Sequence, residues 1–347
     1  MQKDTEIITK DIDHILNSKI PFKKIQGKNF LISGANGFLS FYIINTILTL
    51  NQKSSKKSKV YALVRNKKTA EKKFKFFLKN KFLKIIEHDL SSEIKISDNI
   101  HYVIHAASLA SPKFYASDPI GVIMPNVIGT KNLLEFSKRK QVKSFLFFSS
   151  GEIYGQTEKL LKETDFGCVN SLDLRSCYAI SKLMGENMCL SWFKQKKLPT
   201  KIARIFHTYG PRIKLDDGRV YADFVSNVVQ NKNLIVKSDG KAKRPFCYIT
   251  DATIAFFLIL LNGENGNAYN VSNPDSNVSI LNLAKIISKL FPEKKLKVIV
   301  KKDFNEKNYL KSSIKNQNPD ISKLRTLNWK PEVSIKEGFR RTILSEL

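Results

Sequence analysis

Cysteines, histidines and long apolar runs are scarce in this chain. The four cysteines contain no Cys-x-x-Cys pair and no charged and apolar leader opens the sequence, so we expect no disulfide framework and a cytoplasmic protein. The most apolar run, residues 255–261, is far shorter than the roughly 20 residues that cross a bilayer, so we expect no membrane partner. The histidines show no metal-ligand spacing, and we expect no metal site. The cysteines are Cys168, Cys177, Cys189 and Cys247.

Acidic residues are also few. The 347 residues include 59 Lys and Arg against 31 Asp and Glu, a formal net charge of +28 at pH 7. Such a charge attracts anions and raises nucleic acid as a partner. However, arginine, which binds phosphate through a bidentate fork, is scarce, and the lysines are spread along the chain beside many Asn and Ile. We therefore expect a general attraction for anionic substrates and no nucleic-acid partner.

The pattern of apolar residues predicts an α/β fold. Residues 1–27 are polar, with isoleucines at helical spacing, and indicate an N-terminal helical extension. From Asn29 onward, short apolar runs alternate with helical segments, which predicts a doubly wound parallel sheet of the Rossmann type that binds its ligand at the carboxyl ends of the strands. The expected strands are residues 30–33, 60–64, 85–87, 102–105, 145–149 and 202–205.

Beyond about residue 206 this alternation ends. A helix near residues 222–230, a short strand at residues 234–236 and a mixed tail predict a smaller α/β lobe. We expect residues 28–205 to form the dinucleotide-binding domain, to which residues 249–273 return with a helix that starts at Asp251. Residues 206–248 and 274–347 would then form a substrate-binding lobe.

A glycine-rich turn follows the first expected strand. Residues 33–40 read Ser-Gly-Ala-Asn-Gly-Phe-Leu-Ser. Gly34 and Gly37 permit a tight turn and let a pyrophosphate approach the amino terminus of the next helix, whose free N–H groups favour anions. Ser40, at the third position, is small enough for close helix packing. The cofactor contacts expected here are Gly34, Asn36, Gly37, Phe38 and Leu39.

The second strand lacks the carboxylate that usually binds the ribose hydroxyls of NAD. Arg65 follows this strand instead. Either Arg65 faces the 2′-phosphate of NADP, or it only stacks on adenine or is solvated. Asp89, at the end of the third strand, is placed to meet the adenine edge or serves only as a turn residue. We expect NAD as the cofactor, with NADP left open.

A tyrosine and a lysine four residues apart form the expected catalytic centre. Tyr178 and Lys182 would share one face of a helix. A free phenol titrates near 10, and a neighbouring cation with an oxidised nicotinamide favours its phenolate, a usable base near neutrality. Ser150, at a strand end, is placed to hydrogen-bond the same substrate oxygen, and Glu152 is available as a base or orienting group. These residues predict hydride transfer.

These motifs resemble the extended short-chain dehydrogenase/reductase family of nucleotide-sugar epimerases, dehydratases and decarboxylases, over about residues 28–345. Further matches are residues 105–108 (His-Ala-Ala-Ser), 126–130 (Asn-x-x-Gly-Thr), 204–211, 244–248 and the tail at 319–321 and 329–331. The resemblance implies a nucleotide-sugar substrate and a homodimer. It adds cofactor contacts at Leu90, Ala106, Ala107, Ser108 and Asn126.

Within this family the chain is similar to UDP-glucuronate decarboxylases. The segments that carry this likeness are residues 107–112 with Tyr115, 176–178 and 216–220. The resemblance implies that C4 of the sugar is oxidised, that the resulting β-keto acid loses carbon dioxide, and that the returned hydride yields a UDP-pentose. Epimerisation at C4, 4,6-dehydration and, more remotely, non-catalytic dinucleotide binding stay open.

Three positions depart from the decarboxylase pattern, and Gly151 stands where 4,6-dehydratases of the family carry an acid. Gly151 cannot donate the proton that expulsion of water requires, which argues against ordinary 4,6-dehydration. His207 replaces the usual asparagine, Lys237 a tyrosine and Gln317 an arginine. These changes leave another nucleotide or another sugar open. The substrate contacts that we expect are Ser111, Tyr115, His207, Arg212, Arg219 and Arg244.

Overall fold

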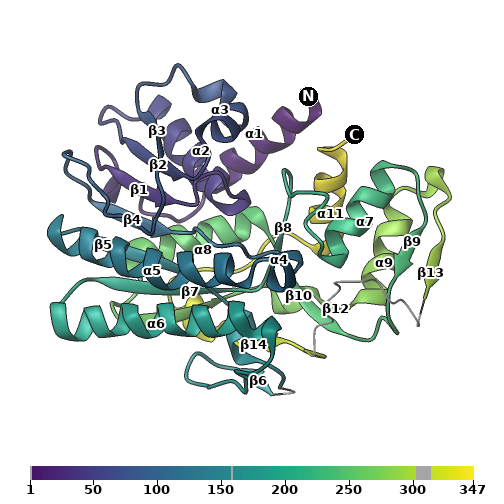
Figure 1. Cartoon of the computed structure of the whole chain (residues 1–347). Coiled ribbons are helices and arrows are strands. Elements are labelled where there is room, and N and C mark those ends of the chain that lie inside the picture. The colour runs from purple at the N-terminus through teal and green to yellow at the C-terminus, as the bar shows by residue number, and fades with distance from the viewer. Residues whose placement is uncertain (1, 158, 302–313) are drawn as a thin grey trace.

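A seven-stranded parallel sheet forms the centre of the molecule, as Figure 1 shows for the computed structural model, which describes residues 2–157, 159–301 and 314–347. The strand order is β11-β7-β5-β4-β1-β2-β3. The doubly wound Rossmann sheet expected from the sequence is thereby confirmed. The strands are β1 (Phe30–Ser33), β2 (Val60–Val64), β3 (Leu83–Glu87), β4 (Tyr102–His105), β5 (Ser144–Ser150), β7 (Thr200–Ile205) and β11 (Asn267–Val271).

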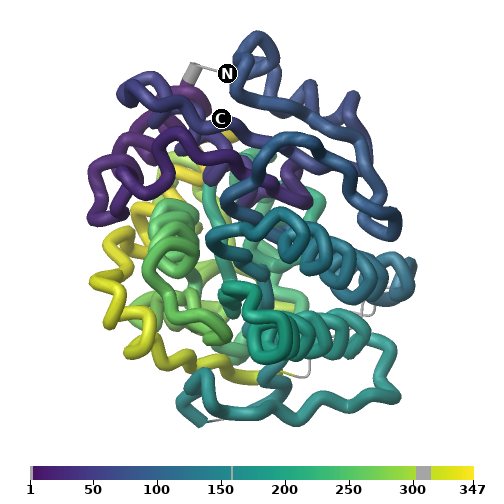
Figure 2. Tube along the Cα trace, turned by 90° about the vertical axis from the view of Figure 1, so that its left-hand side faces the viewer, coloured from purple at the N-terminus to yellow at the C-terminus, as the bar shows by residue number. Residues whose placement is uncertain are grey.

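Both faces of this sheet are covered by helices (Figures 1 and 2). Helices α5 (Pro119–Arg139) and α6 (Cys177–Lys196) cover one face, while α2 (Phe38–Lys53) and α8 (Ile249–Asn262) cover the other. Successive side chains of a strand point to opposite faces, so Leu31 joins the apolar cluster under α5 and α6, whereas Phe30 and Ile32 join the larger cluster under α2 and α8. Strands buried on both faces are therefore nearly all apolar.

The N-terminal segment forms α1 (Gln2–Leu16), which packs on the outer sides of α2 and α8. Ile8, Ile12 and Ile15 point into the core and are buried. The amino and carboxyl ends of the chain lie close together (Figure 1). Residues 2–16 are therefore an integral layer of the molecule.

Beside the large sheet lies a smaller group of elements. Its three-stranded sheet consists of β8 (His207–Tyr209), β10 (Lys243–Tyr248) and β12 (Asn277–Ser279). The short pair β9 (Leu234–Val236) and β13 (Val298–Val300) packs with α7 (Val220–Val229) and α9 (Ile280–Leu290), and α11 (Ile335–Leu344) closes the chain. Of the expected substrate lobe, residues 302–313 lie outside the described residues, and the division into two domains stays a proposal. The remaining elements are α3 (Lys67–Lys73), α4 (Lys113–Ser117), β6 (Leu160–Leu161), β14 (Asn318–Pro319) and α10 (Ser322–Arg325).

The sequence predicts no membrane span, no metal site and no disulfide framework, and the described residues bear on each of these expectations. No helix there has the length and apolar character that crossing a membrane requires. No group of three His, Cys, Asp or Glu side chains in the same residues is arranged to hold a metal ion. The four cysteines are free thiols, of which Cys168 alone is exposed.

Candidate active site

A cavity of about 1490 Å³ opens at the carboxyl ends of the central strands. Its walls come from the loops after β1, β2, β3, β4, β5 and β7, and from β8, β10 and the start of α7. The chain order reverses between β1 and β4, which are neighbours in the sheet. Open α/β sheets bind their ligands at such a point.

The glycine turn after β1 forms one wall of this cavity. Gly34 has a left-handed φ of 62°, and a Cβ there would lie 2.6 Å from the backbone of Ala107. A Cβ on Gly37 would lie 2.9 Å from the carbonyl oxygen of Gly34, so both positions require glycine. Asn36, Phe38 and Leu39 also line the cavity, where α2 begins. This bare backbone at a helix amino terminus fits the pyrophosphate of a dinucleotide.

The other expected cofactor contacts divide into two groups. The same cavity is lined by Arg65, Asp89, Leu90, Ala106, Ala107 and Ser108. Asn126 lies behind the wall instead: it is fully buried, and its Nδ2 donates to Ser181 Oγ at 2.9 Å. Asp89 accepts a hydrogen bond from the backbone N–H of Ser91 at 2.9 Å, and this bond lowers the pKa of its carboxyl.

The four expected catalytic residues meet on the cavity wall. Ser150 ends β5, Glu152 lies in the turn that follows, and Tyr178 and Lys182 occupy the first turns of α6. The Oγ of Ser150 accepts a hydrogen bond from the backbone N–H of Glu152 at 3.1 Å. The ammonium of Lys182 donates to the carbonyl oxygen of Phe148 at 2.7 Å and lies 5.7 Å from the centre of the Tyr178 ring.

Burial controls the titration of this centre. It raises the pKa of Tyr178 to about 12, with a further rise from the charge of Glu152, while a hydrogen bond with Ser150 opposes the shift. Burial also lowers the pKa of Lys182 to about 7. The positive charge of an oxidised nicotinamide would favour the phenolate. The chemistry expected of Tyr178 is therefore coupled to the cofactor.

Tyr115 does not line the cavity. Its side chain is fully buried, and its ring stacks on that of Tyr178 with 5.2 Å between centroids. Its hydroxyl donates to the carbonyl oxygen of Ala110 at 3.1 Å. Instead of a direct substrate contact, the geometry shows a residue that supports the ring of Tyr178 from behind.

Five of the expected substrate contacts line the cavity: Ser111, His207, Arg212, Arg219 and Arg244. Arg212 lies beside the glycine turn, with its guanidinium 4.5 Å from the centroid of the Phe41 ring. His207 Nε2 donates to Gln317 Oε1 at 2.9 Å, and Gln317 Nε2 donates to the carbonyl oxygen of Gly151 at 3.2 Å. Burial lowers the pKa of His207 to about 3, and Arg244 contributes to the shift, so the imidazole is neutral. Two of the positions that depart from the decarboxylase pattern, His207 and Gln317, are thus hydrogen-bonded to each other and, through Gln317, to the backbone of Gly151.

Comparison with known proteins identifies the family. The sequence model described as "NAD dependent epimerase/dehydratase family" matches residues 30–272. The chain belongs to this family. It is accordingly an NAD-dependent enzyme, as the turn after β1 indicates.

Relatives of the chain within the NAD dependent epimerase/dehydratase family include decarboxylases. The chain is similar to UDP-glucuronic acid decarboxylase 3 of Arabidopsis thaliana, with 30% identity over 89% of the chain and 86% of that protein. Identity to UDP-glucuronic acid decarboxylase 1 of Xenopus tropicalis is 29%, over 91% of the chain and 71% of that protein.

Solved structures support the fold of this family member. The UDP-glucuronic acid 4-epimerase of Bacillus cereus, crystallised with UDP-glucuronic acid and NAD, aligns with a TM-score of 0.78, covering 92% of this chain and 98% of its own. The dTDP-glucose 4,6-dehydratase of Bacillus anthracis, in complex with NAD, aligns with a TM-score of 0.75 over 92% and 96%. Their identities of 22% and 19% carry the fold alone.

Among the cavity residues that were not predicted from the sequence are Arg175 and Lys73. Arg175 Nη2 lies 3.8 Å from Glu152 Oε2, and its guanidinium lies over the Tyr115 ring. Its position three residues before Tyr178 is a signal that helical spacing provides. Lys73, at the end of α3, also lines the cavity. The sequence offers no such signal for Lys73, because it is one of many lysines in its segment.

Proposed function

We propose that the chain converts UDP-glucuronate to a UDP-pentose by oxidising C4, releasing carbon dioxide and returning the hydride. Relatives with about 30% identity that are named UDP-glucuronic acid decarboxylases support this substrate. The Rossmann cavity, with Ser150, Tyr178 and Lys182 on one wall, supports oxidation at a sugar carbon. We further propose Arg219 and Arg244 as contacts of the sugar diphosphate.

The observation that supports decarboxylation over 4,6-dehydration is the packing at Gly151. A Cβ on Gly151 would lie 2.5 Å from the ring of Phe206, which is itself buried. The ring therefore fills the space that an acidic side chain would need at this position. Expulsion of a hydroxyl as water requires a proton donor, whereas loss of carbon dioxide from a β-keto acid does not. The packing favours decarboxylation over 4,6-dehydration.

In the proposed reaction each residue of the site has a separate role. Tyr178 takes the proton of the C4 hydroxyl, and Ser150 hydrogen-bonds the same oxygen. NAD, when bound, supplies reversible hydride acceptance. The 4-ketone accepts the electrons released with carbon dioxide, and C5 of the resulting enolate takes a proton from solvent. Glu152 lies near this wall as an orienting group, held 3.8 Å from Arg175.

The mass of the product tests this function. Purified protein is incubated with UDP-glucuronate and with a panel of other nucleotide sugars, and the products are analysed by mass spectrometry. Decarboxylation predicts a UDP-sugar lighter by one carbon dioxide. A different sugar of unchanged mass would show that the reaction is epimerisation and not decarboxylation. A product lighter by one water would show dehydration and would contradict the argument from Gly151. Failure to convert any member of the panel would contradict the proposed function altogether.

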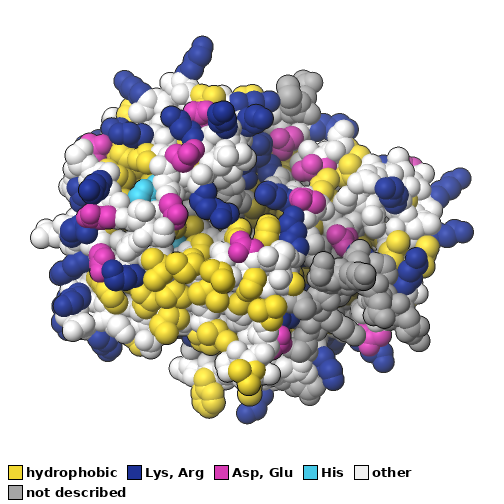
Figure 3. Space-filling model, viewed as in Figure 1, with side chains coloured by type: hydrophobic (Ala, Val, Ile, Leu, Met, Phe, Trp, Pro, Cys, Tyr) yellow, Lys and Arg dark blue, Asp and Glu magenta, His cyan; other side chains and the backbone are white. Residues whose placement is uncertain are grey.

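We also propose that two copies pair through α5 and α6. Figure 3 shows a broad apolar area over these helices. Ile120 and Ile123 on α5, and Leu183, Met184 and Leu190 on α6, are all more than a third exposed. A second copy is the occupant that we propose, because two adjacent helices with their apolar side chains on one face are self-complementary about a two-fold axis.

A further inference from the structure

Two cations lie over a single aromatic ring beside the glycine turn. Phe41, in the first turn of α2, has the guanidinium of Arg212 4.5 Å and the ammonium of Lys73 5.7 Å from its ring centroid. Lys73 Nζ also donates to the carbonyl oxygens of Asn36 at 3.0 Å and Gly37 at 3.3 Å. Segments far apart in the sequence thus bring two positive charges to the turn that fits a pyrophosphate.

Positive charge gathers on the cavity side of this turn. Burial lowers the pKa of Lys73 to about 8, and the nearby charges of Arg212 and Lys214 contribute to the shift. All three cations line the cavity. The acids near Arg212 are Asp4 and Glu346, which lie outside the described cavity lining. Like charges held at short range favour binding of an anion between them.

We propose that Lys73 and Arg212 form a two-cation clamp on the pyrophosphate of bound NAD, with Asp4 of α1 as the positioning residue for Arg212. An ammonium has three donors, and the two bonds of Lys73 to the turn leave one for a phosphate oxygen. A bond between a cation and a phosphate is about twice as strong as a neutral one. The clamp goes beyond the proposed function, because it holds NAD whichever sugar is converted.

Arg212 is held by the N-terminal helix and has an acid of the C-terminal end nearby. Asp4 Oδ2 accepts a hydrogen bond from Arg212 Nη1 at 3.3 Å, and Glu346 lies close enough to Arg212 for the two to interact electrostatically. Arg212 has a left-handed φ of 69°, a conformation that costs free energy unless neighbouring contacts hold it. The N-terminal helix thereby gains a role, since it fixes a cation on the cofactor side of the cavity.

The test measures binding of NAD, NADP, ADP, 2′,5′-ADP and adenosine to protein stripped of cofactor. Lys73→Met removes the ammonium and keeps an apolar stem, and Lys72→Met is the matched control, on the preceding, exposed residue of the same helix. We expect NAD and ADP to bind roughly tenfold more weakly to Lys73→Met and adenosine to bind unchanged, as the loss of one charged hydrogen bond predicts. NAD retained through purification, measured after denaturation, should fall in parallel. Lys73→Arg, which keeps a cation, should retain most of the affinity.

Asp4→Asn tests the positioning role. It should weaken ADP binding roughly threefold in the wild-type background and not at all in Arg212→Gln, because coupled residues are non-additive. Equal ADP binding by Lys73→Met and Lys72→Met would overturn the clamp. An equal loss of adenosine, or a loss confined to NADP and 2′,5′-ADP, would also overturn it, since the cations would then serve adenine or a 2′-phosphate. None of these readings depends on which nucleotide sugar the enzyme converts.

Discussion

The hydroxyl oxygen of Tyr178 carries the proton transfer in the proposed reaction. Tyr178→Phe removes that oxygen and leaves the ring, which stacks on Tyr115 at 5.2 Å. We expect kcat to fall by about 10³-fold, within the range for loss of a general base, while NAD content and melting temperature stay near wild type. Tyr269→Phe, a buried hydroxyl in β11, is the control and should retain activity. Turnover of Tyr178→Phe at the wild-type rate would remove the assigned base.

His207 should make the free energy of unfolding depend on pH. Burial lowers its pKa from 6.5 to about 3 in the folded protein. Between these values the unfolded chain binds a proton that the folded chain does not, so acidification costs stability as the pH falls through this window. His207→Asn lacks the titrating group and keeps an amide beside Gln317.

We therefore expect His207→Asn to lose less stability on acidification than the wild type. Denaturant unfolding of both proteins at neutral pH and at about pH 4.5 measures this effect. Between the two pH values, the free energy of unfolding of the variant should rise relative to that of the wild type by about 2.5 kcal/mol. A difference that stays constant with pH would show that His207 is not the buried neutral group described above.

The sequence predicted many of these residues because their signals are local. Tyr178 and Lys182 are four apart, and the glycine turn lies within eight residues. Tyr115 and Asn126 were expected at the cavity, yet they lie behind it, because the side of a helix that a cavity meets depends on tertiary packing. The hydrogen bonds from His207 through Gln317 to Gly151 join segments that are far apart in the sequence, so no local spacing predicts them.

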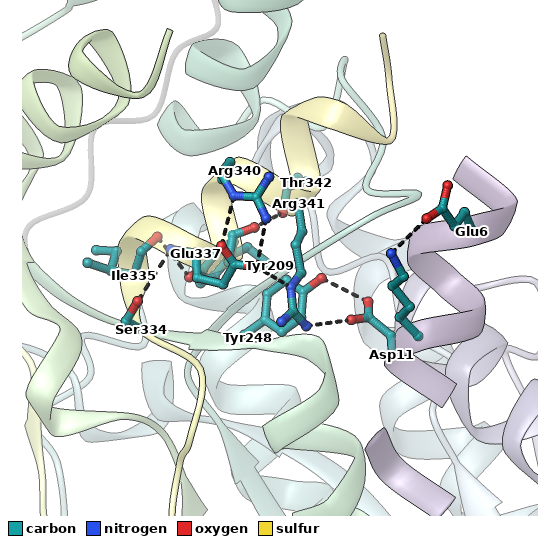
Figure 4. A network of polar contacts seen from close by, with 12 residues as sticks. Glu6, Asp11, Tyr209, Tyr248, Ser334, Ile335, Glu337, Arg340, Arg341 and Thr342 are labelled. Atoms are coloured by element: carbon teal, nitrogen blue, oxygen red, sulfur yellow. Dashed lines mark hydrogen bonds and ion pairs between the residues drawn. The ribbon is translucent and has the colours of Figure 1, made fainter. Parts of the chain in front are cut away.

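At the scale of elements, one buried carboxylate of α1 contacts three other elements of the fold. Asp11 is fully buried, and its Oδ2 accepts hydrogen bonds from the hydroxyls of Tyr42 at 3.0 Å and Tyr248 at 2.8 Å. Arg341 Nη1 donates to its Oδ1 at 3.0 Å, as Figure 4 shows. Helices α1, α2 and α11 and the end of β10 thus meet at one side chain.

Removing this carboxylate should destabilise the whole fold. Asp11→Ala leaves two buried hydroxyls without their acceptor and removes one of the two carboxylates that Arg341 contacts, so we expect a loss of about 3 kcal/mol in the free energy of unfolding. Glu6→Ala is the control on the same helix: its pair with Lys10 is exposed and is worth about 0.5 kcal/mol at most. Urea unfolding measures both, and equal losses would refute the central role of Asp11.

The sequence predicts some strands of the central sheet more clearly than others. The apolar runs of β1, β2 and β4 match the expected bounds, because strands covered by helices on both faces are nearly all apolar. β11 is not among those runs, since Asn267 and Asn270 interrupt its apolar residues. Asn270 is nevertheless buried, with its Oδ1 accepting from the Tyr154 hydroxyl at 2.8 Å. The local pattern alone would place Asn270 in a loop. Its hydrogen bond with the distant Tyr154 offsets the cost of burying its amide in a strand.

At the scale of the whole molecule, the apolar face of α5 and α6 predicts the oligomeric state. Met184 is 49% exposed on that face, and a charge there would be buried against the second copy of the proposed pair. We expect the wild type to sediment at twice its chain mass of 39.6 kDa and Met184→Asp at the mass of one chain. Phe76→Asp is the control, because Phe76 is 64% exposed in a separate turn between α3 and β3. A monomeric wild type, or a Met184→Asp protein that still pairs, would place the interface elsewhere or remove it.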